Sequence, residues 1–109
     1  MIKVMIIPRA GENVYALLVR KERELRENRK GTLHRTGRKR KDFEKWTHTS
    51  YPGSIRLQNC LEGIAAAAIQ CKKPNEEWQL MKSFVGFLDR HFRGNISSIF
   101  INYGDSKNA

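Results

Sequence analysis

The most regular pattern in the sequence lies at residues 75–93, NEEWQLMKSFVGFLDRHFR. Apolar side chains recur there three or four positions apart, the spacing that places them on one face of an α-helix. Acidic residues occupy the first turn and basic residues the last turn, as the helix dipole favours. We predict a long helix over about 75–93 that covers a β-sheet with one apolar stripe, formed by Trp78, Met81, Phe84, Val85, Leu88 and Phe92.

The segments on either side of this helix have the patterns of strands. Residues 2–8 form a short run rich in β-branched side chains. Residues 54–58 and 96–103 alternate between polar and apolar side chains, the period-2 pattern of a strand with one buried face. These three segments therefore supply strands for the sheet under the predicted helix.

Two further segments fit both a strand and a helix. For residues 14–28 we favour a strand at 14–20 that forms a hairpin with the first strand, although residues 20–28 are rich in helix-forming side chains. For residues 61–71 we favour a strand, although the same side chains also fit an amphipathic helix. Both choices stay open at this point.

This order of elements predicts an α+β fold with two layers. One long helix covers a mostly antiparallel sheet of four to five strands, in the order β-β-loop-β-β-α-β. If residues 14–28 are helical instead, the order becomes βαββαβ, which is ferredoxin-like. The 109 residues have the length of one domain, so we treat residues 1–109 as a single unit.

Positive charge is concentrated in one quarter of the chain. The formal net charge is +10. Residues 19–45 hold twelve basic and five acidic side chains, and residues 29–41 hold seven basic side chains and no acidic one. Gly31 and Gly37 interrupt any helical pattern there, so we predict an exposed basic loop at about 28–42. Such a surface favours nucleic acid, DNA or RNA, or an acidic protein surface as partner.

The basic loop and the aromatic residues that follow it form the candidate nucleic-acid site. Lysine and arginine side chains neutralise phosphates, and aromatic rings stack on unpaired bases. Trp46 lies beside Phe43 and is a candidate core residue as well. The candidate phosphate-binding residues are Arg29, Lys30, Arg35, Arg38, Lys39, Arg40 and Lys41, and the candidate stacking residues are Trp46, His48 and Tyr51.

We therefore predict a small nucleic-acid-binding module without enzymatic activity. One alternative is a regulatory protein-interaction module of unknown function that forms a homo-oligomer through a sheet edge. A second alternative is a small metal-independent ribonuclease, in which His34 or His48 is the base and a nearby cation stabilises the reacting phosphate.

Other classes of protein find little support in the sequence. The longest apolar run, residues 64–69, is far shorter than the ~20 residues of a membrane helix, so we expect no membrane partner. Residues 1–8 lack the layout of a signal peptide, so we expect a cytoplasmic protein, or a nuclear one in a eukaryotic host because residues 37–41 read GRKRK. The three histidines and two cysteines have no metal-ligand spacing, and we expect no metal and no cofactor.

Overall fold

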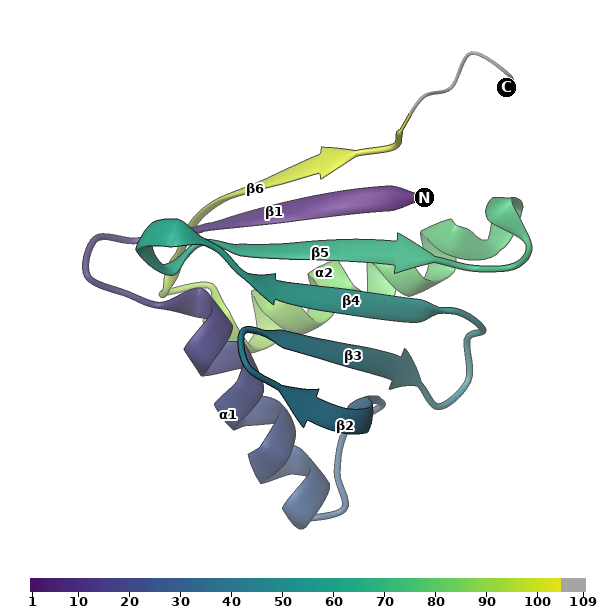
Figure 1. The fold of residues 1–109 in the computed structure, drawn as a ribbon, viewed down its shortest axis with the longest axis horizontal. Coiled ribbons are helices and arrows are strands. Elements are labelled where there is room, and N and C mark those ends of the chain that lie inside the picture. Colours follow the sequence, from purple (N-terminus) through teal and green to yellow (C-terminus); the bar gives the residue numbers. More distant parts are fainter. Residues whose placement is uncertain (105–109) are drawn as a thin grey trace.

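The computed structural model describes residues 1–104 and has an α+β fold with two layers (Figure 1). Its strands are β1 (Ile2–Pro8), β2 (Leu33–Arg40), β3 (Phe43–His48), β4 (Ser54–Asn59), β5 (Ala65–Gln70) and β6 (Ile96–Asn102). Its helices are α1 (Val14–Glu27) and α2 (Glu77–Phe92), with short 3₁₀ turns at Leu61–Gly63 and Pro74–Glu76. The strands form one sheet in the order β2-β3-β4-β5-β1-β6, and all neighbouring strands are antiparallel.

The predicted fold class is confirmed, whereas the number and order of strands differ. The sheet has six strands rather than four or five, and two helices rather than one cover it. The long helix predicted at 75–93 corresponds to α2 and the 3₁₀ turn before it. The strand favoured within 61–71 is β5, and the final strand is β6. Neither the β-β-loop-β-β-α-β order nor the βαββαβ alternative describes the complete chain of elements.

The strand predicted at 14–20 is wrong, because this segment begins α1. The Asn13 side chain accepts a hydrogen bond from the Ala16 backbone N–H at 3.0 Å, which caps the helix. Leu18 and Glu22 are both buried and lie one turn apart, so the buried residues have the spacing of a helix face rather than of a strand. Asn13 is therefore a helix cap and not the turn residue of a hairpin.

The exposed loop predicted at 28–42 is also corrected, because most of it forms the edge strand β2. Its residues pair with β3 from Leu33 opposite His48 to Arg40 opposite Phe43. Only Leu33 of this strand is buried, so no apolar alternation marked it in the sequence. An edge strand needs only one hydrogen-bonded neighbour, and charged side chains on it protect the edge from unwanted pairing.

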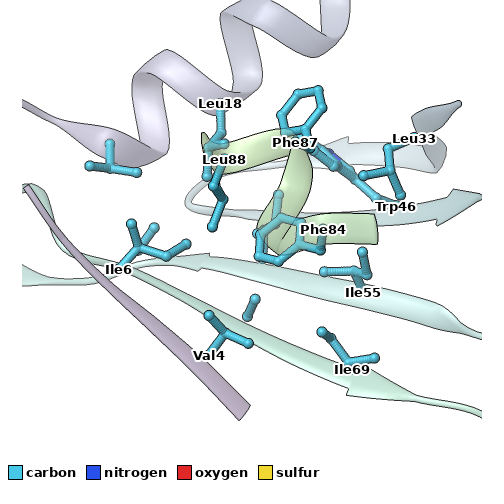
Figure 2. Packing of buried hydrophobic residues seen from close by; sticks show 14 of the residues in the cluster. Val4, Ile6, Leu18, Leu33, Trp46, Ile55, Ile69, Phe84, Phe87 and Leu88 are labelled. Carbon is cyan, nitrogen blue, oxygen red and sulfur yellow. The ribbon is translucent and has the colours of Figure 1, made fainter. Parts of the chain in front are cut away.

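The core lies between the two helices and one face of the sheet (Figure 2). Trp46 of β3 is fully buried and meets Phe84 and Phe87 of α2 edge to face, with ring centroids 6.3 and 5.6 Å apart. In α2 the buried stripe includes Leu80 and Phe87, whereas Trp78, predicted in the stripe, is 50% exposed. The helix is thus rotated slightly from the predicted orientation. Neither α1 nor α2 is long and apolar enough to cross a membrane.

Candidate nucleic-acid interface

The face of the sheet opposite the helices carries no covering layer of helix (Figure 1). Side chains alternate across a strand, so the residues between the buried positions of β1, β3, β4 and β5 lie on this face. We call it the open face. Its members on β1 and on β3 to β6 include Lys3, Met5, Phe43, Lys45, Arg56, Gln58, Ala66, Ala68, Phe100 and Asn102.

Four cations meet at the end of the open face nearest β2. Arg38 and Arg40 of β2, Lys45 of β3 and Arg56 of β4 line one depression of about 320 Å³, together with Phe43. We call these four residues the cation cluster. Within residues 1–104, no carboxylate lines this depression or forms an ion pair with any of the four. The cluster therefore has an unbalanced positive charge.

Strand register brings the cation cluster together. Lys45 is the direct partner of Arg56 across β3 and β4, and Arg40 is the direct partner of Phe43 across β2 and β3. The β2–β3 pairing is irregular between Thr36 and Arg40, and Gly37 within this bulge has a φ of 78°. A bulge increases the local twist and redirects side chains. The bulge lies beside the cluster, and Gly37 lines the same depression as Arg38 and Arg40.

An elongated groove of about 510 Å³ continues from the cation cluster across the open face. Phe43 and Arg56 line both depressions. The small side chains Ala66 and Ala68 of β5 lie in the middle of the sheet, with longer side chains on either side of them. Beyond them the groove reaches Lys3 and Met5 of β1 and Phe100 and Asn102 of β6. The groove thus combines aromatic, aliphatic and cationic side chains.

The predicted basic residues divide into separate groups. Arg38, Lys39, Arg40 and Lys41 are all exposed at the β2–β3 turn, and we call these four residues the hairpin tip. Asp42 follows the tip, and its carboxylate accepts a hydrogen bond from the Asn59 side chain at 2.9 Å. Arg29 and Lys30 follow α1, before β2 begins, roughly 20 Å from the tip at the usual rise of a strand. The structure does not bring these two groups together.

The side chains of Arg35 and Trp46 contact a buried carboxylate and do not belong to the exposed cationic surface. Trp46 is fully buried and cannot reach a base at the surface, and its indole N–H donates to the buried carboxylate of Glu44 at 3.0 Å. The guanidinium of Arg35 lies 4.0 Å from the same carboxylate. The buried Glu44 carboxylate therefore accepts a hydrogen bond from Trp46 and has the Arg35 cation beside it. This leaves His48 and Tyr51 as the predicted stacking residues with exposed atoms.

His48 and Tyr51 stack on each other, with ring centroids 4.5 Å apart. The His48 Nδ1 accepts hydrogen bonds from the Ser50 and Tyr51 backbone N–H groups, at 2.9 and 3.2 Å. Burial lowers the pKa of His48 from its ordinary value of 6.5, which favours the neutral ring. Strand β3 begins at Phe43 and ends at His48, so the His48–Tyr51 pair lies at the far end of β3 from Phe43 and away from the cation cluster. Tyr51 is 39% exposed and offers only part of its ring.

The other candidate base, His34, has both ring nitrogens beside acceptors. Its Nδ1 lies 3.2 Å from the buried Glu22 carboxylate, and its Nε2 lies 3.1 Å from the Gly31 carbonyl oxygen. Arg26 donates to the same Glu22 oxygen at 3.0 Å. These contacts join the end of α1 to the start of β2. They leave no ring nitrogen of His34 directed at a substrate, whereas the ribonuclease alternative needs one.

Lys3, Lys45, Arg56 and Phe100 are further candidate interface residues, which the sequence did not single out. A partial signal was present, because Arg56 occupies the outward position between Ile55 and Leu57 in the alternating β4 pattern. What was missing was the register that places β3 beside β4 and β6 beside β1. Without this register, the sequence indicates only that Phe100 belongs to an alternating strand, and not that it lies on the same face as Lys3, Lys45 and Arg56.

A third depression, of about 660 Å³, adjoins the open face at the opposite end of β4 and β5. It shares Lys45 with the cation cluster and adds Lys72 and Lys73, but Glu76 also lines it. Its charge is therefore partly balanced. In residues 1–104, no group of three histidine, cysteine or acidic side chains is arranged to hold a metal ion.

Comparisons with known proteins give no relative from which a function could be transferred. No protein-family model matches the chain, and neither a curated protein nor a solved structure matches it significantly. The assignment of function therefore depends on the geometry and chemistry of the open face alone.

Proposed function

We propose that this protein binds nucleic acid through phosphate contacts made by the cation cluster and the hairpin tip, without catalysing a reaction. The observation that carries the proposal is the convergence of Arg38, Arg40, Lys45 and Arg56 on one depression with no described acidic residue in its lining. Arginine presents a planar fork of donors that matches two phosphate oxygens. Cations held by neighbouring strands are also positioned before the ligand arrives, which lowers the entropic cost of binding.

The surrounding charges support the same proposal. Lys39 and Lys41 extend the positive surface beyond the cluster, and Lys3 extends it along the groove. Among residues 1–104, Asp42 is the acid next to the hairpin tip, and it accepts a hydrogen bond from Asn59. No described acid lines the cation cluster or the groove, and Glu22, Glu44 and Glu77 are buried. An anionic chain that approaches the open face therefore meets an excess of cations, which increases the association rate, and its binding releases counterions.

The test compares two variants that lose the same charge at different places. In the first variant, the hairpin tip is neutralised by R38Q, K39Q, R40Q and K41Q. In the second, R20Q, R23Q, K82Q and R90Q remove four exposed cations from the helices α1 and α2. Fluorescence anisotropy with labelled oligonucleotides over a salt series then gives the affinity and its salt dependence for each protein.

We expect the tip variant to bind much more weakly than the control, with a thermal melt close to wild type. If all four tip cations contact phosphates of a single strand, the slope of log K against log salt becomes shallower by about 3. Equal losses in the two variants would show that only net charge matters, and would contradict a site at the tip. No binding by the wild type at about 150 mM salt would overturn the proposal and favour a protein partner.

A further inference from the structure

The groove that extends from the cation cluster contains a feature that phosphate binding alone does not explain. Phe100 is 61% exposed and Met5, its direct partner on β1, is 46% exposed. Both lie on the open face and line the groove, next to Lys3. Phosphates need no aromatic side chain, whereas unpaired bases stack readily on one.

We propose that the open face binds single-stranded nucleic acid, whose phosphates contact the cation cluster while an unpaired base stacks on Phe100. This inference rests on the proposed function and adds to it the strandedness of the ligand and the residue that recognises it. The ligand would lie across the strands, from β2 at one edge of the sheet to β6 at the other.

The dimensions of the sheet agree with this path. Phe43 on β3 and Phe100 on β6 are separated by four inter-strand spacings, about 19 Å at ~4.8 Å each. Both phenylalanines lie in the same row of directly paired residues, which continues through Gln58, Ala66 and Met5. The alanine in the middle of this row leaves space above the central strand. The row therefore has an aromatic ring near each end and a small side chain at its centre. Its length is sufficient for several nucleotides.

A second row provides the charge for the backbone of the same strand. This row runs from Lys45 and Arg56 through Ala68 to Lys3 and Asn102, so two of its cations are direct partners and the third lies beyond the alanine. The cationic row is thus parallel to the aromatic row and lies two residues from it along each strand, on the same face of the sheet. A single strand has its phosphates on one side and its bases on the other, so the two rows fit its two sides. In a duplex the bases stack on each other and are not free to cover Phe100.

The charge of the open face argues against a second copy of this chain as its occupant. Lys3, Lys45 and Arg56 lie on it, and none of its described members is acidic. Two such faces would repel each other in a face-to-face dimer, because like charges brought together are unfavourable. A polyanion with exposed apolar rings satisfies both the cationic and the aromatic row.

The test measures binding to labelled oligothymidylate and oligouridylate of about 12 nucleotides, and to a duplex of the same length. Phe100→Ala should weaken single-strand binding about 5- to 150-fold, because stacking on one aromatic ring contributes about 1–3 kcal/mol. Its salt slope and its affinity for duplex should not change. Trp78→Ala is the matched control, because Trp78 is also exposed but lies on α2, in the other layer. This control should bind as the wild type does.

A second measurement detects the stacking directly. In a Phe100→Trp variant that also carries Trp78→Phe, a base stacked on residue 100 should quench the tryptophan fluorescence, and duplex should leave it unchanged. Wild-type affinity in Phe100→Ala together with no quenching would overturn the inference. The proposed function would survive that result if the hairpin-tip variant still lost binding. No binding by the wild type would overturn both proposals.

Discussion

The two faces of the sheet hold their aromatic and charged residues in opposite ways. On the covered face, Trp46, Phe84 and Phe87 pack against each other, and the buried carboxylate of Glu44 has an indole N–H as its partner. On the open face, Phe100 is mostly exposed and no described carboxylate lines the depression at the cation cluster. The same side-chain types thus stabilise the fold on one face and remain free to bind a ligand on the other.

The burial of acidic residues also explains why positive charge is concentrated on the exposed surface. Glu22, Glu44 and Glu77 are all buried, and each one accepts a hydrogen bond from a neighbouring group. Burying acids with their partners leaves the exposed surface richer in cations than the overall composition indicates. The faces are therefore expected to respond differently to mutation, in stability on one side and in binding on the other.

The largest difference between the faces is expected for an aromatic residue from each. Trp46→Ala should lower the free energy of unfolding by about 3–5 kcal/mol, because it opens a cavity beside Phe84 and Phe87 and removes the partner of Glu44. Phe100→Ala should change it by less than about 0.5 kcal/mol. Urea unfolding measures both. Equal losses would mean that the open face is part of the packed structure.

A smaller and sharper difference is expected for two arginines of the same strand. Arg35→Ala should lower the free energy of unfolding by about 1–2 kcal/mol, because Glu44 stays buried without its nearby cation. Arg38→Ala should leave stability unchanged within about 0.5 kcal/mol and should weaken oligonucleotide binding. Chemical denaturation and anisotropy on both variants check this. The comparison fails if Arg35→Ala affects only binding, or if Arg38→Ala affects only stability.

The smallest effect is expected from pH at His48. Burial lowers its pKa in the folded state, so the unfolded chain binds a proton more readily. Stability is therefore complete above the unfolded pKa of 6.5 and falls as the pH decreases from there towards the folded pKa. A proton on Nδ1 would also conflict with the two N–H groups that donate to it.

The His48 effect is measured as the change in melting temperature between about pH 7.5 and pH 5.5. His48→Gln removes this titration, so its melting temperature should fall less over the same interval. Oligonucleotide binding, which we assign to the open face, should be close to wild type in this variant at pH 7. An unchanged pH dependence would contradict the burial of His48 as its source.

The sequence allowed the elements with a strong internal pattern to be predicted. The stripe of α2 and the alternation of β4 and β6 are local, and their positions were predicted closely. The segment that became α1 was predicted wrongly because Asn13 suits a turn as well as a helix cap, and only the bond to Ala16 distinguishes them. Strand β2 has a single buried residue, Leu33, and is held by pairing with β3, which no local pattern reveals.

The candidate site was predicted only in part, for the same reason. The hairpin tip is a continuous run of charge and was found directly. Lys45 and Arg56 join Arg38 and Arg40 only through the register of three strands. Phe100 joins the groove because β6 pairs with β1, from the opposite end of the sequence. Nonlocal pairing therefore determines which of the many cations, and which exposed ring, form one surface.

Lysine footprinting with and without a single-stranded oligonucleotide tests most directly whether the open face is the binding surface. Acetylation of exposed lysines, followed by mass spectrometry, reports each position separately in one folded sample. We predict that the oligonucleotide protects Lys3 and Lys45 on the open face and Lys39 and Lys41 at the hairpin tip, while Lys82 on α2 reacts as before. Protection of Lys82 with no protection of Lys3 and Lys45 would contradict the account and place the ligand on the helices.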